Sequence, residues 1–134
     1  MKLKVLSFFV LFFISGLIIS CGNDDDKNNE CIEYEVGYVT SVNAPTTGNV
    51  NETINIEVNF GVFNGCGEFE KFIETQNGNV RTIEVEAKYE GCVCTQEAPI
   101  RTTNYEFTVS NAGEYELNFK SSQTEFITVT ITIN

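Results

Sequence analysis

The sequence from residue 31 onward predicts an all-β fold, an antiparallel β-sandwich of about seven strands. Apolar and polar side chains alternate with a period of two in segment after segment, which is the pattern of a strand with one buried face. Clusters of Gly, Pro, Asn and Ser separate these segments at intervals of about 8–12 residues, as they do in sandwiches. No segment after residue 20 has the period of an amphipathic helix.

The predicted strands follow one another in the order 32–42, 53–60, 69–75, 80–89, 103–109, 115–119 and 127–133. In each strand the main apolar side chains share one parity, and we expect that face to be buried: Ile32, Tyr34, Val36, Tyr38, Ile54, Ile56, Val58, Phe60, Ile83, Val85, Ala87, Tyr89, Tyr105, Phe107, Val109, Tyr115, Leu117, Phe119, Ile127, Val129, Ile131 and Ile133. The charged side chains around the fourth strand are expected to point largely outwards: Arg81, Glu84, Glu86 and Lys88.

Turn-forming residues punctuate these strands. Asn43–Asn49 contains Pro45 and Gly48 and ends the first strand. Asn64–Gly67 forces a tight connection, and Asn77-Gly78 is the strongest short hairpin signal in the chain.

A longer motif, Asn111-Ala112-Gly113-Glu114-Tyr115-Glu116-Leu117, follows the fifth strand. It resembles the Asp-x-Gly-x-Tyr-x-Cys motif of immunoglobulin-like domains, in which the tyrosine hydroxyl bonds back to the backbone and forms a corner. Asn111 stands for the Asp and Leu117 for the Cys, and the chain has no Trp. The resemblance is therefore to the broad group of immunoglobulin-like sandwiches and covers residues 31–134. A generic Gly-x-Tyr hairpin turn is the alternative.

The first twenty residues have the features of a secretion signal. Lys2 and Lys4 precede an apolar run, Val5–Ile19, whose helix would be about 22 Å long, short of the ~30 Å bilayer core. The run ends in Ile18-Ile19-Ser20-Cys21, which resembles a bacterial lipobox, where signal peptidase II cuts before a diacylglycerol-modified cysteine. The resemblance implies that residues 1–20 are a cleaved signal peptide and that Cys21 is the lipidated N-terminus. An uncleaved anchor or an ordinary secretion signal is the alternative.

Residues 21–30 contain no apolar side chain after Cys21 and predict a disordered acidic tether. As a flexible coil it would span roughly 15–18 Å. Asp24, Asp25 and Asp26 resemble the acidic signals that follow the lipidated cysteine in surface-exported lipoproteins of the Bacteroidetes. A solvated charge run or a loose calcium site are the alternatives. The whole chain resembles small Bacteroidetes lipoproteins with one immunoglobulin-like domain, which implies a surface-exposed outer-membrane location.

Composition limits the function classes. Removing Lys2 and Lys4 with the signal leaves 6 basic against 19 acidic residues, a net charge of −13. Such a surface repels phosphates, so we expect no nucleic acid partner, and membrane attachment must come from the lipid. The chain has no His, which excludes Ser-His and Cys-His dyads. No nucleotide or phosphate-binding motif is present, and we expect neither catalysis nor a cofactor.

Four cysteines remain after lipidation: Cys31, Cys66, Cys92 and Cys94. An even number in an oxidising compartment predicts two disulfides rather than a metal site, whose spacing would differ. Tracing the strand directions places all four at one pole. If position 66 faces roughly position 89 across the hairpin, Cys92 lies nearer to it than Cys94. This favours Cys66–Cys92 with Cys31–Cys94 over Cys31–Cys92 with Cys66–Cys94.

The opposite pole collects the turns 43–52, 77–79 and 110–113 with the C-terminus, and it is the expected binding surface because loops carry binding more often than strands. Its amide side chains are Asn43, Asn49, Asn51, Asn77, Asn79 and Asn111. The sequence thus predicts a non-catalytic binding or accessory module for a protein or glycan. A structural or spacer lipoprotein without a ligand is the alternative, since Asn is also a common turn residue.

Overall fold

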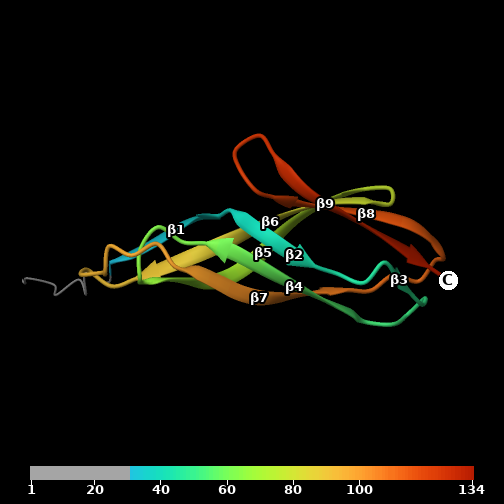
Figure 1. Cartoon of the computed structure of the whole chain (residues 1–134), viewed down its shortest axis with the longest axis horizontal. Helices are drawn as coiled ribbons and strands as arrows, with labels where there is room; N and C mark the ends of the chain where they lie inside the picture. Colours follow the sequence, from blue (N-terminus) through green and yellow to red (C-terminus); the bar gives the residue numbers. More distant parts are fainter. Residues whose placement is uncertain (1–30) are drawn as a thin grey trace, which may run out of the picture.

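Nine strands in two sheets build residues 31–134, the part of the chain that the structure, a computed structural model, describes (Figure 1). Their bounds are β1 Ile32–Gly37, β2 Val39–Asn43, β3 Thr47–Gly48, β4 Ile54–Gly61, β5 Gly67–Asn77, β6 Val80–Glu90, β7 Ile100–Phe107, β8 Gly113–Lys120 and β9 Phe126–Ile133. The predicted all-β sandwich is confirmed. Residues 1–30, which include the predicted signal peptide, Cys21 and Asp24–Asp26, lie outside the described residues.

The smaller sheet has the order β2-β4-β7, and both of its pairings are antiparallel. The larger sheet has the order β1-β6-β8-β9-β3, with β5 on the other side of β6. Two of its pairings, β6 with β8 and β3 with β9, are parallel, so the sandwich is mostly rather than wholly antiparallel.

Strand β6 organises the larger sheet because it runs between the two ends of the molecule. Its first residues, Val80–Ile83, pair with β8, and Val85–Glu90 pair with β1 along the same edge. Its other edge pairs with β5 along nearly the whole length, through the predicted hairpin at Gly78. The start of β6 thus lies beside β8, where Val80 pairs with Glu116. The end of β6 lies beside the start of β1, where Glu90 pairs with Ile32.

The core lies between the two sheets. It consists mostly of the apolar side chains that the alternating sequence pattern predicts to be buried. The buried side chains include Ile54, Ile56, Val58, Phe60, Ile83, Val85, Ala87, Tyr89, Tyr105, Phe107, Tyr115, Leu117, Phe119, Ile131 and Ile133. Val109, Ile127 and Val129 are partly buried against them. Burying this apolar surface is the main stabilising contribution to the fold.

The predicted first strand, 32–42, is wrong in its continuity and in its buried parity. It divides after Gly37, so that β1 joins the larger sheet and β2 the smaller one. Gly37 and Val39 are buried, whereas Tyr34 is 49% exposed. The crossing requires a glycine, because a Cβ on Gly37 would lie only 2.6 Å from Cδ2 of Phe60.

The predicted tyrosine corner is present. The Tyr115 hydroxyl donates a hydrogen bond to the Asn111 carbonyl oxygen at 2.8 Å. Gly113, between them, has a φ of +150°, which glycine adopts far more readily than other residues.

The four described cysteines form two disulfides at one pole, as predicted, but the favoured pairing is wrong. The bonds are Cys31–Cys92 and Cys66–Cys94. Pairing of β1 with β6 brings Cys31 beside Gly91, whose N–H donates to the Cys31 carbonyl at 2.9 Å, and so beside Cys92. The chain then turns at Gly91, with a φ of +140°, and returns Cys94 towards Cys66.

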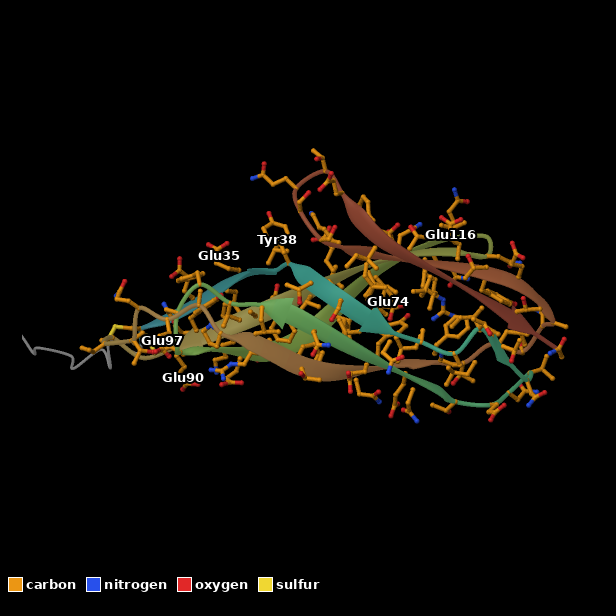
Figure 2. The ribbon with its side chains drawn as sticks, viewed as in Figure 1. Glu35, Tyr38, Glu74, Glu90, Glu97 and Glu116 are labelled. Carbon is orange, nitrogen blue, oxygen red and sulfur yellow. A yellow bond between two sulfur atoms is a disulfide. The ribbon has the colours of Figure 1, made fainter. Side chains whose placement is uncertain are left out.

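We call this end, with the two disulfides, the cysteine pole, and the opposite end, with the C-terminus, the distal pole (Figure 1). Figure 2 shows Glu90 and Glu97 at the cysteine pole, beside the sulfur atoms. Within residues 31–134 there is no helix of the length and apolar character that crossing a bilayer requires. The same residues contain no group of three or more His, Cys, Asp or Glu side chains arranged to hold a metal ion.

Candidate functional site

The turns predicted to meet at the distal pole do meet there, and backbone hydrogen bonds hold them together. The N–H of Asn51 donates to the Val109 carbonyl at 2.8 Å, and the N–H of Val50 donates to the Asn134 carbonyl at 3.2 Å. The N–H of Glu116 donates to the Asn79 carbonyl at 3.0 Å. Segments far apart in the sequence therefore form one continuous surface around the open end of the sandwich.

A pocket of about 430 Å³ lies within this surface, between the ends of the two sheets. We call it the distal pocket. Strands β5 and β6 and the hairpin between them contribute Gln76, Asn79 and Arg81. The turn between β7 and β8 contributes Thr108–Asn111, Asn51 comes from the turn before β4, and Tyr115 completes the lining.

Three of the six predicted asparagines, Asn51, Asn79 and Asn111, line the distal pocket. The other three do not. Asn43 lies at the end of β2 and pairs with Glu57, and Asn77 ends β5. Asn49 uses its amide to donate to a Glu52 carboxylate oxygen at 2.8 Å. The turns therefore meet as predicted, three of the six asparagines line the distal pocket, and the binding role of all six stays a prediction.

The three asparagines of the pocket differ in how far the fold already uses them. The Asn79 amide donates to the Glu114 carbonyl at 3.1 Å and so joins the β5–β6 hairpin to β8. Asn111 accepts the Tyr115 hydroxyl through its backbone carbonyl only, and Asn51 bonds through its backbone N–H only. Within residues 31–134, the side-chain amides of Asn51 and Asn111 make no hydrogen bond, so both are available to a ligand.

Arg81 also lines the distal pocket, although the sequence analysis placed it on the outer face. Its side chain is only 16% exposed. The guanidinium carbon lies 4.8 Å from the centre of the Phe107 ring, a cation–π contact. Nη1 donates to the Tyr105 hydroxyl at 3.4 Å, and Nη2 donates to the Thr108 carbonyl at 3.5 Å.

The inward orientation of Arg81 follows from the alternation of side chains along β6. Position 81 has the same parity as Ile83 and Val85, which are fully buried on the inner face of β6. An inward-facing arginine at the end of a strand can lie along the core and direct its charged group to the open end. The charge of Arg81 predicts an outward-facing side chain, but its parity with Ile83 and Val85 places it on the inner face of β6.

The charge of Arg81 is the least closely paired among the cations of the described region. Its Nη1 lies 3.7 Å from Glu74 Oε2. The other ion pairs are closer, at 3.3 Å for Lys71–Glu86, 3.1 Å for Lys88–Glu90, 2.9 Å for Arg101–Glu68 and 3.0 Å for Lys120–Glu84. Moreover, Nε of Arg81 is buried and has no hydrogen-bond partner in this part of the chain. Buried polar groups without partners are rare in folded proteins, so this one calls for an explanation.

Tyr105 beside it is held in its neutral form. Its side chain is buried, and burial raises the pKa of Tyr105 to about 12, because the phenolate would lose its hydration. The hydrogen bond from Arg81 opposes this rise without cancelling it. At neutral pH Tyr105 is therefore an uncharged acceptor, and Glu74 is the carboxylate that the described residues place within ion-pair distance of the guanidinium.

The comparison with protein families bears on this same region. A model of the ORF11 beta-sandwich domain matches residues 56–133, more than half of the chain. The chain belongs to the ORF11 beta-sandwich domain family. No curated protein and no solved structure matches it at the required significance.

The residues matched by the ORF11 beta-sandwich domain run from β4 to β9 and contain nearly all of the distal pocket, including Arg81, Asn79 and Asn111. Cys31 and Asn51 lie outside the match. One cysteine of the Cys31–Cys92 disulfide and one residue of the pocket lining, Asn51, therefore come from the segment that precedes the matched region.

A second pocket, of about 410 Å³, lies at the cysteine pole of the ORF11 beta-sandwich domain. Cys31, Ile32, Tyr89 and Cys94 are among its lining residues. The Tyr89 hydroxyl already accepts a hydrogen bond from the N–H of Phe63 at 3.1 Å. The Phe63 ring stacks on the Tyr89 ring, with 3.9 Å between the ring centres. This pocket has no cation in its lining and adjoins the start of the described chain, so the distal pocket is the stronger candidate.

Proposed function

We propose that the protein is a surface-exposed outer-membrane lipoprotein whose non-catalytic β-sandwich binds a protein or glycan through the distal pocket. One observation carries the binding part of the proposal. The distal pocket is polar, and it contains two amide side chains and one guanidinium whose hydrogen-bonding capacity the fold leaves partly unused. Groups of this kind give a concave site its specificity.

The anchoring part of the proposal rests on the sequence. Ile18-Ile19-Ser20-Cys21 resembles a lipobox, and the diacylglycerol on Cys21 would supply the two chains that stable anchoring requires. Asp24–Asp26 resembles an export signal. All of these residues lie outside the described region.

The polarity of the molecule agrees with this arrangement. Cys31, the first described residue, lies at the cysteine pole. The β5–β6 hairpin and the turn before β8, which line the distal pocket, lie towards the C-terminus at the other end (Figure 1). A tether that enters at the cysteine pole and spans roughly 15–18 Å would keep that pole near the membrane and leave the distal pocket accessible.

A spacer without a ligand is the second candidate, and one observation favours it. Asn79 joins the hairpin to β8, and Arg81 contacts both Tyr105 and Phe107, so part of the pocket also supports the fold. A spacer would need these contacts but would have no use for the unbonded amides of Asn51 and Asn111.

The two candidates separate in a capture experiment with the lipidated chain. Asn51→Ala and Asn111→Ala remove side-chain amides that support no described contact, and Asn43→Ala is the matched control outside the pocket. We expect the first two variants to reduce capture of a partner from envelope extract, while the control captures normally. Asn111→Ala should leave stability unchanged, whereas Asn51→Ala should lose some stability because Asn51 has a φ of +60°, which Ala adopts less readily than Asn. Unchanged capture by both pocket variants, with loss on changing Glu84 and Glu86, would move the site to the sheet face.

A further inference from the structure

We propose that the distal pocket binds an acidic saccharide and that Arg81 receives the carboxylate of a uronic acid residue. This inference rests on the proposed function and names its ligand class. It depends on the unused donors of Arg81, on its weakly paired charge, and on the polar character of the walls around it.

The guanidinium of Arg81 has hydrogen-bonding capacity that the fold does not use. A guanidinium has five N–H donors, and good N–H···O bonds to charged acceptors are about 2.7–2.9 Å long. The two bonds that Arg81 donates are 3.4 and 3.5 Å long, both to neutral oxygens, so Nη1 and Nη2 are only weakly engaged by the fold. A carboxylate at the open side of the guanidinium would offer shorter, charge-assisted bonds to Nη1 and Nη2.

The positive charge of Arg81 lies farther from its carboxylate partner than the other cations of the described region lie from theirs. The nearest carboxylate, Glu74, stays 3.7 Å away and is itself partly exposed. At this distance no direct hydrogen bond joins the two side chains, so the guanidinium keeps its donors for a closer acceptor. An anion that reaches hydrogen-bond distance from Arg81 gains more than the existing ion pair provides.

The guanidinium of Arg81 is held in place by the side chains around it. The guanidinium carbon lies 4.8 Å from the centre of the Phe107 ring, and Nη1 donates to the Tyr105 hydroxyl, so two core side chains limit the movement of the group. The donors are therefore already oriented before the ligand arrives, which reduces the ordering entropy lost on binding. A planar fork of this kind suits a planar carboxylate.

The side chains that line the distal pocket suit a saccharide better than a peptide. The pocket lining is mainly polar, with Val109 as its one aliphatic side chain. The amides of Asn51 and Asn111 can each donate and accept, and the Ser110 hydroxyl can do both. Such walls suit a ligand covered with hydroxyl groups, whereas a peptide would need apolar surface for its side chains.

A carboxylate fits better than a phosphate for a related reason. A phosphate monoester brings up to two negative charges to a site that already has Glu74 at its edge, on a chain of net charge −11. A uronate brings one charge, which the guanidinium can match. The ring hydroxyls then engage the amides.

The test uses the full chain purified in detergent and oligosaccharides of galacturonate, glucuronate and mannuronate, each as the acid and as its methyl ester. The ester keeps the sugar ring and the hydroxyls but removes the charge, so this comparison needs no variant. We expect at least one acid to bind, measured by calorimetry, and its ester to bind at least about tenfold more weakly, as for loss of a charge-assisted hydrogen bond.

Variants locate the site. Arg81→Gln should abolish binding of the acid, Arg81→Lys should retain a part of it, and Asn111→Ala should weaken both acid and ester. Lys71→Gln removes a positive charge from the sheet face and should bind normally. Because Arg81 also contacts the core, thermal unfolding of each variant is compared, and Asn111→Ala serves as the reporter that needs no change in the core.

Three outcomes would overturn the inference: equal binding of acid and ester, binding by none of the uronates, or tighter binding of a short peptide through its C-terminal carboxylate. In each case the proposed function survives if capture of the envelope partner still depends on Asn51 or Asn111. If capture depends on neither side chain, the proposed function fails as well, so the two failures are distinguishable.

Discussion

The Tyr115 hydroxyl donates a hydrogen bond to the Asn111 carbonyl 2.8 Å away, and this one contact connects the fold to the candidate site. It closes the turn before β8 and leaves the Asn111 amide at the distal pocket. The corner therefore closes the turn and also positions Asn111 in the lining of the distal pocket.

Tyr115→Phe removes this hydrogen bond and keeps the ring. Because the substitution removes one hydrogen bond that closes the turn, we expect the free energy of unfolding to fall by about 1 kcal/mol. Tyr34→Phe is the matched control, since Tyr34 is 49% exposed on β1. Urea unfolding of both variants measures the difference, and equal stabilities would show that the corner contributes nothing.

The disulfide pairing can be tested with paired substitutions. Replacing Cys31 and Cys92 by Ser should leave the Cys66–Cys94 bond intact, so reduction should raise the intact mass by about 2 Da. Each lost bond should lower the free energy of unfolding by about 2–4 kcal/mol.

The control replaces Cys66 and Cys92 instead and leaves Cys31 and Cys94, which are not bonded to each other in the structure. We expect this variant to be destabilised by the loss of both bonds. A single bond formed readily between Cys31 and Cys94, with stability like that of the first variant, would favour the other pairing.

Tyr105 should make stability depend on pH in the alkaline range. The ordinary pKa is 10.0 and the pKa in the fold is about 12, so between these values the unfolded chain releases a proton that the folded chain retains. The contribution is fully present below pH 10 and should decline by about 1.4 kcal/mol per pH unit as the pH rises towards 12.

The comparison variant is Tyr105→Phe, which cannot ionise. Burial also raises the pKa of Tyr89, so the whole chain loses some stability in this range, and the informative quantity is the difference between the two proteins. Urea unfolding at a series of pH values measures it. Parallel pH profiles would mean that Tyr105 is not protected from ionisation.

Cys21→Ala should abolish lipidation and release the protein from the membrane, because no other thiol lies beside the apolar run. Metabolic labelling with a fatty-acid analogue measures this directly, with the unmodified chain as control. Label that persists on the variant would refute the lipobox resemblance.

The period-two pattern was sufficient to predict the sandwich and most of its core, because parity alone determines which face of a strand is buried. It failed where the chain changes sheets at Gly37, since a crossing depends on close packing against Phe60, which no local pattern records. The disulfide pairing failed for a similar reason. The turn at Gly91 reverses the order in which Cys92 and Cys94 meet their partners.

The candidate site was predicted in part. The convergence of the turns at one pole followed from the strand directions, and it brought Asn51, Asn79 and Asn111 together. Arg81 could have been found from its parity with Ile83 and Val85, had the alternation been applied to the charged residue as well. The weak ion pair to Glu74 and the unpartnered Nε depend on distances, and only the structure supplies those.

The most direct measurement is photo-crosslinking on intact cells that express the lipidated chain. A photoreactive residue at Ser110, on the rim of the distal pocket, is compared with one at Val93, which is 94% exposed at the cysteine pole. The account predicts a crosslinked partner from position 110 that Asn111→Ala weakens, and none from position 93. Crosslinking from position 93 alone would contradict it and place the binding surface at the other end of the molecule.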